Sequence, residues 1–317
     1  MSKMIRSHSV ELALLAILIA AIGYFAYLAY GLMPGSVADQ TFSGSRALDH
    51  ARQIASFGPR PVGSTGNERA GEWIVQYVQG QSWDVVLQPF TATNQLPAQN
   101  IIAIRSPNGL NAPVGLVVTH YDSRLLADAD PNPANRETAG VAANKAASGA
   151  AILAELARTL DVEESGHTIC LAFFDAEENG GLPEWDANIG SRLFLENLDI
   201  SASRCASPRF VVVVDQVGAA NAIIQPIGVN GTLDQALRTI AIELGYGDRF
   251  QDTPVEATSN NVNWFLQRGI ESATIKDSTY PFTDSLSDTV DKLKSNSLEE
   301  VGQTLEVWLE RGSDFAR

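Results

Sequence analysis

Beyond about residue 100, short apolar runs alternate with amphipathic stretches along the chain. The run "GLVVTHYD" is apolar on both faces over too few residues for a buried helix, which predicts a buried strand. The later stretch "SGAAILAELARTL" repeats apolar residues at helical spacing, so a helix with one buried side is expected at 148–160. Strands are predicted at 100–106, 115–122, 168–178, 209–218 and 272–276. Alternating strands and helices predict an α/β fold with a mostly parallel, twisted sheet flanked by helices.

Helical patterns also occur on both sides of this region. Residues 43–78 are expected to be helical, with a Pro- and Gly-rich break at "FGPRPVGSTGNERA" that separates two helices. The late stretch "SLEEVGQTLEVWLERG" predicts another helix, and Ser297 with Glu300 predicts a capping box at its start.

The N-terminal pattern is different, because residues 12–33 are apolar and carry no charge. A helix of that length, at about 1.5 Å per residue, spans the roughly 30 Å hydrocarbon layer of a membrane. Lys3 and Arg6 precede it, which by the positive-inside rule places the N-terminus in the cytoplasm and the main domain outside. A cleaved signal peptide is the alternative, but its apolar core would be shorter, and we favour a retained single-pass anchor. The expected organisation is a tail at 1–11, a transmembrane anchor at 12–33, a linker at 34–42 and an extracytoplasmic domain at 43–317.

Composition narrows the class of protein. The chain has 317 residues, 45% of them hydrophobic, which is enough for a sizeable core. Its formal net charge of −15 argues against a nucleic-acid partner, because phosphate binding needs a basic face. Two cysteines cannot form a disulfide framework. One bridge between Cys170 and Cys205 can form, but the apolar run around Cys170 favours a buried free thiol.

Three of the predicted strands end on side chains that can bind metals. "HYD" supplies His120 and Asp122, "DAEE" supplies Glu177 and Glu178, and "DQVG" supplies Asp215. In open α/β sheets the ligand crevice lies beyond the carboxyl ends of the strands. The five residues are therefore expected to converge on one crevice.

These residues lie in motifs that resemble those of the zinc-dependent aminopeptidases and glutaminyl cyclases, a metallopeptidase family that includes inactive relatives. The resemblance covers the chain from about Phe57 onward, with the motifs in the family's order. They are "FGPRPVGSTGNERA", "HYDSRLLADADPNPANR", "FFDAEENGGLPEWDANIGSRLF", "VVVVDQVG" and "YPFTDSLSDTVDKLKSNSLEEVG". The third motif resembles the cyclase-like branch, because it contains that branch's tryptophan-bearing insert. The resemblance implies the zinc-exopeptidase, or phosphorylase/hydrolase-like, fold and a partner that presents a peptide or protein N-terminus.

The resemblance also implies roles for the five residues. In the family, two zinc ions share a bridging carboxylate, polarise the scissile carbonyl and lower the pKa of a bound water. His120 and Asp215 match ligands of one zinc, and Glu178 matches a ligand of the other. Asp122 matches the carboxylate that orients the histidine, and Glu177 matches the general base.

Two of the family's ligands are replaced in this chain. Lys145 stands where the family places the bridging aspartate, and Asp284 stands where it places the last histidine. No histidine follows His167, and residues 259–265, which match a histidine-bearing loop of the cyclase branch, contain none. A lysine ammonium has three donors and is long enough to reach a metal position. We therefore expect Lys145 to be an internal counter-ion in place of zinc. The alternative is a one-residue shift that turns Asn144 inward and leaves Lys145 in solvent.

Two functions remain open at this point. Loss of the bridging carboxylate and of the last histidine favours a pseudoenzyme that binds peptide N-termini with weak zinc or none. Retention of Glu177 and Asp122 favours an active aminopeptidase or glutaminyl cyclase with one metal held by His120, Asp215 and water. We favour the pseudoenzyme.

Four other residues have simpler interpretations. Trp185 and Trp264 either line a peptide pocket or pack in the core, and packing is favoured. Asp128 and Asp130 are interpreted as charges of a solvated loop.

Overall fold

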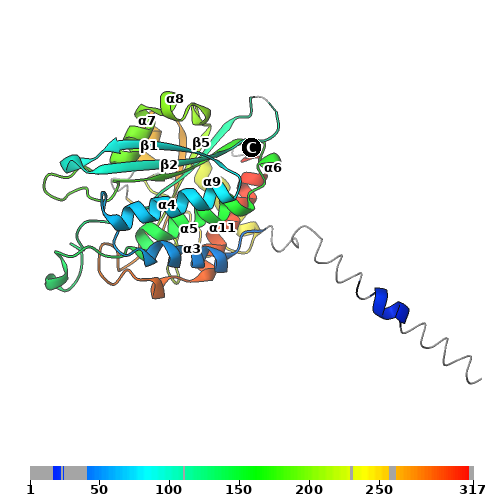
Figure 1. Cartoon of the computed structure of the whole chain (residues 1–317), viewed down its shortest axis with the longest axis horizontal. Helices are drawn as coiled ribbons and strands as arrows, with labels where there is room; N and C mark the ends of the chain where they lie inside the picture. The colour runs from blue at the N-terminus through cyan, green and yellow to red at the C-terminus, as the bar shows by residue number, and fades with distance from the viewer. Residues whose placement is uncertain are drawn as a thin grey trace, which may run out of the picture. The chain divides into compact units, whose positions relative to one another are not determined.

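The computed structural model describes residues 17–22, 24, 41–109, 111–228, 231–256 and 262–313. The chain divides into two compact units, Met1–Thr41 and Phe42–Arg317, and every element discussed below belongs to the second (Figure 1). In the first unit, residues 17–22 and 24 are helical. Across the described part of the chain, no helix is both long and apolar enough to cross a membrane. The rest of the expected anchor at 12–33 lies outside the described residues, so the anchor stays a prediction.

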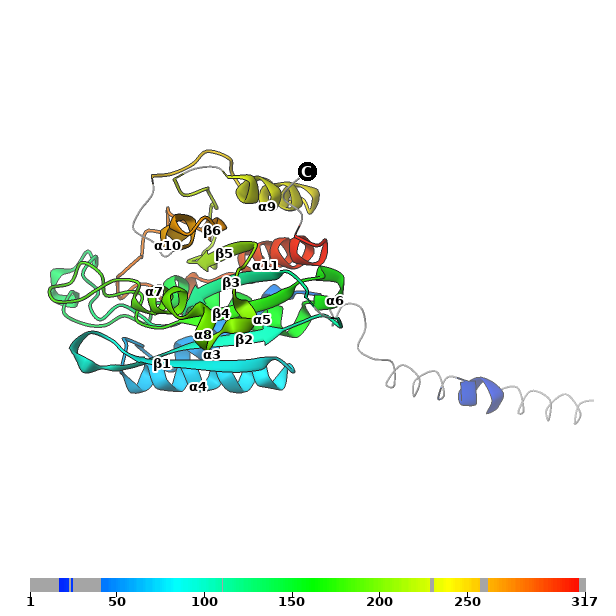
Figure 2. The same ribbon diagram turned by 90° about the horizontal axis from the view of Figure 1, so that it is seen from above.

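A six-stranded mixed sheet forms the centre of the second unit (Figure 2). Its strands are β1 (Asp84–Thr91), β2 (Pro97–Arg105), β3 (Val114–His120), β4 (Thr168–Phe174), β5 (Phe210–Asp215) and β6 (Glu271–Lys276). Their spatial order is β1-β2-β4-β3-β5-β6. The pairs β4–β3, β3–β5 and β5–β6 are parallel, whereas β1–β2 and β2–β4 are antiparallel. The α/β class is confirmed, and the parallel part of the sheet is limited to four strands.

The sequence pattern did not predict β1, which is an edge strand. Most of its side chains are partly or fully exposed, so no buried apolar run marks it. Pro89 suits an edge position, because proline has no N–H to donate to a further neighbour. β1 and β2 are consecutive antiparallel strands, a connection that a strict alternation of strands and helices does not include.

Helices flank both faces of the sheet (Figures 1 and 2). They are α3 (Gly44–Ser56), α4 (Thr65–Gly80), α5 (Ser148–Thr159), α6 (Val162–Ser165), α7 (Ile189–Glu196), α8 (Leu198–Ser201), α9 (Thr232–Glu243), α10 (Val262–Gln267) and α11 (Ser295–Glu310). Single helical turns are η1 (Thr93–Gln95), η2 (Pro133–Asn135), η3 (Ala143–Ala147), η4 (Ser203–Cys205) and η5 (Val290–Lys292). The helices expected at 43–78 and 148–160 are present as α3, α4 and α5.

Side chains of the central strands alternate between two apolar cores, one on each face of the sheet. In β2, Ile101 and Ala103 lie in one core, and Ile102 and Ile104 lie in the other. The first core contains side chains of α3, α4, α5, α9 and α11, and the second contains side chains of α7, α8 and α10. Because both faces are covered, β3, β4 and β5 are apolar except near their ends.

The start of α11 differs from the prediction. The expected capping box of Ser297 with Glu300 is wrong, because α11 begins at Ser295 and Ser297 lies in its first turn. Ser297 is fully buried, and its Oγ donates to the carbonyl of Ala219 at 2.8 Å. The hydroxyl therefore ties α11 to the segment after β5 instead of capping the helix.

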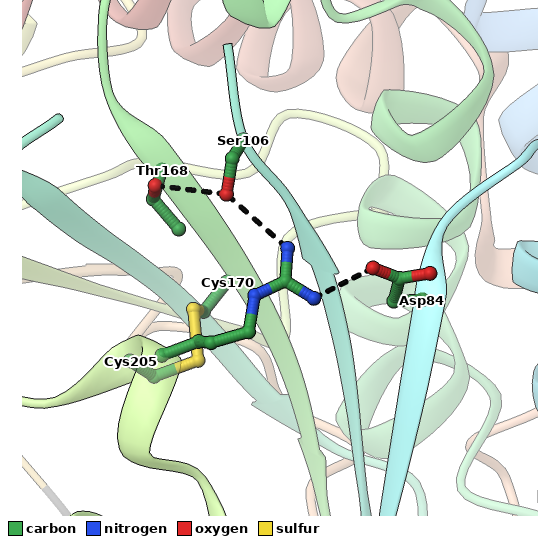
Figure 3. Close-up of a disulfide and its surroundings, with 6 residues drawn as sticks. Asp84, Ser106, Thr168, Cys170 and Cys205 are labelled. Carbon is green, nitrogen blue, oxygen red and sulfur yellow. Dashed lines mark hydrogen bonds and ion pairs between the residues drawn. A yellow bond between two sulfur atoms is a disulfide. The ribbon is translucent and has the colours of Figure 1, made fainter. Parts of the chain in front are cut away.

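Cys170 and Cys205 form a disulfide, so the expectation of a free thiol at Cys170 is wrong (Figure 3). Burial of Cys170 was predicted correctly, but burial of one cysteine does not show whether a second cysteine lies close enough to pair with it. η4 brings Cys205, also fully buried, to a Cα–Cα distance of 6.1 Å. Beside the bridge, Arg204 donates to Asp84 Oδ2 at 2.6 Å. η4 is thus joined covalently to β4 and by an ion pair to β1.

Candidate functional site

Neighbouring parallel strands end at the same edge of the sheet, and each brings polar side chains there. His120 is the last residue of β3, and Asp215 is the last residue of β5. Glu177 and Glu178 follow β4 after a short turn. β3 lies between β4 and β5, so its histidine lies between the acids of its two neighbours. The structure therefore brings the predicted residues together.

These side chains line a cleft of about 370 Å³, called here the strand-end cleft. Its lining residues are Thr119, His120, Arg124, Lys145, Glu177, Glu178, Gly180, Gly181, Ala187, Asn188, Val213, Val214, Asp215, Thr274, Lys276 and Asp284. Half of them carry ionisable side chains, divided equally between acidic groups and groups that can be positive. The cleft is therefore a network of opposite charges and not a purely acidic site.

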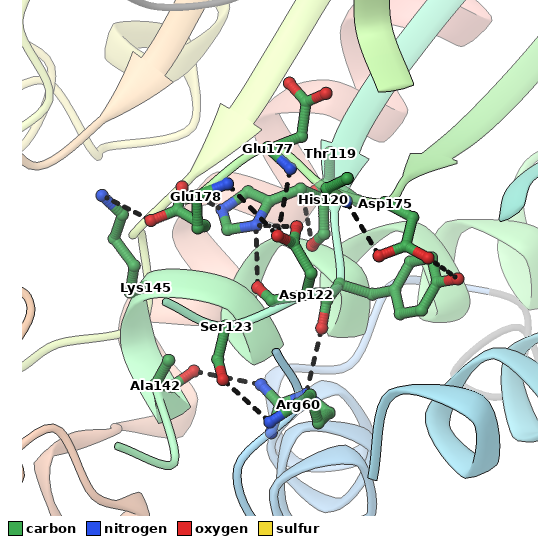
Figure 4. A network of polar contacts seen from close by, with 12 residues as sticks. Arg60, Thr119, His120, Asp122, Ser123, Ala142, Lys145, Asp175, Glu177 and Glu178 are labelled. Atoms are coloured by element: carbon green, nitrogen blue, oxygen red, sulfur yellow. Dashed lines mark hydrogen bonds and ion pairs between the residues drawn. The ribbon is translucent and has the colours of Figure 1, made fainter. Parts of the chain in front are cut away.

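His120 is oriented by Asp122, two residues later (Figure 4). His120 Nδ1 lies 3.1 Å from the carbonyl oxygen of Asp122 and 3.3 Å from its Oδ1. Asp122 Oδ2 accepts the backbone N–H groups of Glu177 and Glu178, at 3.0 and 3.2 Å. One fully buried carboxylate thus fixes the imidazole relative to the turn after β4.

The other ring nitrogen of His120 faces two carboxylates. Nε2 lies 3.4 Å from Glu178 Oε1 and 3.4 Å from Asp215 Oδ1. Burial alone would lower the pKa of His120, but Glu178, Asp122 and Asp215 together raise that pKa well above its ordinary value. In the protonated form both ring nitrogens donate, so the imidazolium bridges the acids.

Lys145 lies on the other side of Glu178. Its Nζ is 3.2 Å from Glu178 Oε2, and the two side chains are only 13% and 12% exposed. Burial would lower the pKa of Lys145, but Glu178, Asp215 and Asp284 raise that pKa above its ordinary value. Burial would raise the pKa of Glu178, but Lys145 and His120 lower it. Lys145 is a charged group inside the site, so the alternative that leaves it in solvent does not hold.

The backbone around η3 directs Lys145 into the cleft. η3 is a π-helical turn, a form that often occurs at functional sites, and it follows Ala142, whose φ of 49° is left-handed. Asp288 accepts the backbone N–H groups of Asn144 and Lys145, at 2.7 and 3.0 Å. Asn144 is fully buried and accepts the N–H of Gly218 at 2.7 Å, so it supports the loop and does not line the cleft.

Arg60, from the first motif, supports the same loops from beneath (Figure 4). Its guanidinium donates to the carbonyls of Tyr121 at 3.0 Å, Gly58 at 3.0 Å and Ala142 at 3.3 Å. Ser123 accepts its backbone N–H at 2.8 Å. Burial lowers the pKa of Arg60 to about 10, so it remains charged at neutral pH. The motif thus positions the segments that carry His120 and Lys145.

A second lysine, which the sequence analysis missed, lies at Asp215. Lys276 is the last residue of β6, in register with Asp215, and its Nζ donates to Asp215 Oδ2 at 2.6 Å. Its side chain is 16% exposed. Burial would raise the pKa of Asp215, but Lys276, His120 and Lys145 hold it well below its ordinary value. The available signal was a lysine at the carboxyl end of the predicted strand "SATIK".

Glu177 lines the cleft but is held by α7. Its Oε1 accepts the backbone N–H of Ser191 at 2.7 Å, and its Oε2 accepts the Ser191 hydroxyl at 2.9 Å. Burial raises the pKa of Glu177 to about 8. Burial therefore favours the protonated form of Glu177, the residue that the family resemblance matches to the general base.

Asp284, which the family resemblance matches to the last histidine, also lines the cleft. Its backbone is left-handed, with a φ of 53°, and its carbonyl accepts the N–H of Ala129 at 3.2 Å. Burial raises the pKa of Asp284, and Lys145 opposes that shift. Its carboxylate accepts no hydrogen bond from the residues that the structure describes.

Arg124 connects the cleft to the neighbouring loop. Its guanidinium pairs with Asp128 at 2.7 Å and donates to the carbonyls of Glu178 and Gly180, at 2.5 and 2.9 Å. These contacts tie the Glu178 segment to the loop after β3.

The interpretation of Asp130 as a solvated charge is wrong. Asp130 is 2% exposed, and its Oδ2 accepts the backbone N–H of Leu286 at 2.9 Å. Its Oδ1 accepts the backbone N–H of Asn132 at 2.9 Å and the amide of Asn135 at 3.0 Å. This carboxylate therefore fastens the loop after β3 to the loop that carries Asp284.

The two tryptophans lie outside the lining of the strand-end cleft. Trp185 is partly buried against a small apolar cluster that includes Val62 and Ile189. Trp264 is partly buried against the core on the α7 side of the sheet, where Phe265 is fully buried. Both side chains pack against apolar neighbours.

Two lysines of the cleft lie where they would compete with a zinc ion for its carboxylates. No group of three or more His, Cys, Asp or Glu side chains in the described residues is arranged to hold a metal ion. Lys145 contacts Glu178 and Lys276 contacts Asp215, the two carboxylates that the family resemblance assigns to zinc. An ammonium a few ångströms from a divalent ion adds repulsion on the order of several kcal/mol at an effective dielectric near 20.

Comparisons with known proteins agree with this fold. Peptidase family M28 matches residues 100–309. The glutaminyl-peptide cyclotransferase of Drosophila melanogaster is 26% identical over 241 residues, which is 71% of this chain and 64% of that protein. The chain therefore spans less than two thirds of that relative's length.

Solved structures of similar fold include cyclases and an aminopeptidase. The Tannerella forsythia glutaminyl cyclase gives a TM-score of 0.78 at 23% identity, covering 86% of this chain and 100% of that chain. The Porphyromonas gingivalis glutaminyl cyclase gives 0.76 at 25% identity, covering 85% and 98%. A leucine aminopeptidase precursor from Bacteroides thetaiotaomicron gives 0.77 at 23% identity, covering 86% and 97%.

The mixed sheet, its two helical layers and the cleft at its carboxyl edge define an α/β protein with the zinc-exopeptidase fold. The family match covers more than half of the chain. The chain belongs to peptidase family M28, and its relatives are glutaminyl cyclases and zinc-dependent exopeptidases.

Proposed function

We propose that this chain is a pseudoenzyme of the M28 family that binds the N-terminus of a peptide or protein in the strand-end cleft without zinc-dependent catalysis. One observation carries the proposal. Lys145 lies 3.2 Å from Glu178, and Lys276 lies 2.6 Å from Asp215. The carboxylates that would bind zinc are thus paired with cations of the chain itself.

Two polar groups of the cleft support a ligand of this kind. The Asp284 carboxylate lines the cleft and accepts no hydrogen bond from the described residues, so it is available to a peptide ammonium. Thr274 Oγ1 is buried, belongs to a residue that lines the cleft, and has no hydrogen-bond partner in the described structure. A buried hydroxyl without a partner costs free energy, which a polar ligand would recover.

Backbone strain around the cleft supports the retention of a binding site. Ala142, Ala176, Asn188 and Asp284 all have left-handed φ values, between 49° and 59°. Each such non-glycine residue costs on the order of 1 kcal/mol, and such strain concentrates at functional sites. Four such positions beside the cleft support a retained binding site.

The proposal is tested by measuring peptide and zinc binding with the full chain in detergent micelles. A fluorescent peptide with a free N-terminus is expected to bind at least about tenfold more tightly than its acetylated form, a difference of about 1.4 kcal/mol. Asp284→Asn should remove this preference, and Asp186→Asn, at an exposed position, should not. Zinc content after loading and gel filtration should be far below one ion per chain. A stoichiometric zinc ion, or equal affinity for both peptides, would contradict the proposal.

An active enzyme with one metal is the second candidate, and two distances favour it. His120 Nε2 lies 3.4 Å from an oxygen of Glu178 and of Asp215, close to the roughly 3.3 Å that separates two ligands of a tetrahedral zinc. Aminoacyl reporters and peptides with N-terminal glutamine test this candidate. Turnover that is abolished both by chelators and by Glu177→Gln would favour it over the binding function.

We also propose that residues 12–33 anchor the chain in a membrane, with the main domain outside the cytoplasm. The Cys170–Cys205 disulfide supports this location, because such bridges persist in oxidising compartments. Labelling with a membrane-impermeant maleimide in intact cells tests it. Ser36→Cys should be labelled and Ser2→Cys should not, and the reverse pattern would overturn the orientation.

A further inference from the structure

The charged groups of the strand-end cleft form one continuous chain of contacts. In order along this chain, the groups are Lys145, Glu178, His120, Asp215 and Lys276. Their successive closest distances are 3.2, 3.4, 3.4 and 2.6 Å. Each carboxylate lies between two groups that can be positive, and the two lysines stand at the ends.

The register of the sheet places the second lysine. Asp215 and Lys276 are the last paired residues of the parallel strands β5 and β6, so their side chains leave the sheet on the same face. Thr274, two residues before Lys276, lines the same cleft, as expected for that alternation. Lys276 is therefore held at Asp215 by β6 and does not depend on a loop.

The exposure of the four side chains shows why both lysines are needed. Glu178 and Asp215 are 12% and 13% exposed, and Lys145 and Lys276 are 13% and 16% exposed. Removing charges from water is costly unless each is paired. Lys145 pairs with Glu178 but forms no ion pair with Asp215 in the described structure, so one lysine leaves the second acid to His120 alone.

We infer that Lys145 and Lys276 act as a pair, each taking the place of one cation of a dinuclear metal centre. This rests on the proposed function, because it presumes that no zinc is held by the native chain. It goes further in assigning Lys276, to which the resemblance gave no role, as the group that pairs with Asp215 in the other half of the site. A lysine that only ended a strand in solvent would be more exposed and would have no buried acid at 2.6 Å.

Zinc titration of a matched set of variants tests the inference. The set is the wild-type full chain, Lys145→Asp, Lys145→Asp with Lys276→Met, and Lys294→Met as a control on an exposed lysine. Calorimetry should detect no zinc binding to the wild type or to Lys294→Met. Lys145→Asp restores the bridging carboxylate but leaves Lys276 on Asp215, so it should bind zinc at least about tenfold more weakly than the double variant.

The outcomes separate the two proposals. Zinc bound tightly by the wild type would overturn the proposed function. If Lys145→Asp alone binds zinc as tightly as the double variant, Lys276 does not oppose zinc binding and the inference fails. Absence of zinc binding by a double variant that still unfolds cooperatively would also overturn it.

A double-mutant cycle on Asp215 and Lys276, measured by thermal unfolding, gives a second readout in case a zinc variant does not fold. Lys276→Met leaves Asp215 without its closest cation and should lower the melting temperature by roughly 6–12 °C. Asp215→Asn combined with Lys276→Met should recover at least half of that loss, since the carboxylate that Lys276 pairs with is removed together with the lysine. A melting temperature unchanged by Lys276→Met would contradict a pairing role. So would a double variant whose loss in melting temperature equals the summed losses of Lys276→Met and Asp215→Asn.

Discussion

Asp288 accepts the backbone N–H of Lys145 at 3.0 Å and, through its other oxygen, the N–H of Asn144 at 2.7 Å. The acid lies 143 residues further along the chain than the lysine. The hydroxyl of Tyr280 donates to it at 2.9 Å. A carboxylate from the segment after β6 thus fixes the backbone that presents a cation to Glu178.

Replacing Asp288 should therefore disturb both stability and the position of Lys145. In Asp288→Asn, an amide N–H₂ faces a backbone N–H, so a buried donor loses its acceptor. The free energy of unfolding should fall by about 1–3 kcal/mol, measured by urea denaturation. Tyr280→Phe, which removes only the hydroxyl bond to Asp288, is the matched control and should cost less. Equal losses in the two variants would show that the backbone contacts are not the important ones.

The Lys145–Glu178 pair predicts strong coupling between the two side chains. Glu178→Gln leaves a buried ammonium without its acid, and Lys145→Met leaves a buried carboxylate without its closest cation. Each should lower the free energy of unfolding by about 3–5 kcal/mol, since removing one partner of a buried pair leaves an uncompensated charge. The double variant should lose less than either single variant. Additive losses in the thermodynamic cycle would exclude a direct interaction between them.

The raised pKa of Asp175 predicts that the free energy of unfolding falls as the pH rises. Burial raises the pKa of Asp175 to about 7, from an ordinary value of 3.8. The native state thus holds this proton more tightly than the unfolded chain, so the contribution is complete below about pH 4 and is lost as the pH rises through 7. The loss amounts to at most about 4 kcal/mol. Urea denaturation across this range should show a flatter pH dependence for Asp175→Asn, whereas the exposed Asp186→Asn should keep the wild-type slope.

The disulfide predicts sensitivity to reductants. Cys170 and Cys205 are 35 residues apart in sequence, and closing a loop of that size stabilises a fold by about 2–4 kcal/mol. Cys170→Ala with Cys205→Ala should lose this amount in urea denaturation, and the wild type in a strong reductant should lose a similar amount. The double alanine variant should not respond further to reductant. A reductant effect that persists in this variant would place its cause elsewhere.

Much of the fold could be predicted from the sequence, because the central strands carry their own signal. β3, β4 and β5 are buried on both faces, so their apolar runs stand out. β1 could not be found in this way, since an edge strand with mixed exposure has no continuous pattern. The capping box predicted at Ser297 is wrong for a related reason. The spacing of Ser297 and Glu300 is also compatible with a buried serine that donates to the carbonyl of Ala219.

Part of the site could be predicted for a geometric reason. His120 and Asp215 end two neighbouring parallel strands, Glu178 follows a third after a short turn, and such strand ends meet at one edge of a sheet. Lys276 follows the same rule but was overlooked, because a lysine at a strand end is usually solvated. Its pairing with Asp215 depends on the register of β5 and β6, which no single strand reveals. Asp130 was misjudged similarly, since its partner Leu286 lies in a distant loop.

The two lysines of the strand-end cleft have a consequence for where this protein can work. A metal centre is filled from the surroundings and is emptied by scarcity, by chelators or by competing ions. The lysine ammonium groups are covalent parts of the chain, so every molecule contains them and no chelator can remove them. On the proposal above, the cleft therefore keeps its electrostatic form in media that would strip a zinc enzyme, because its cations are side chains of the folded chain.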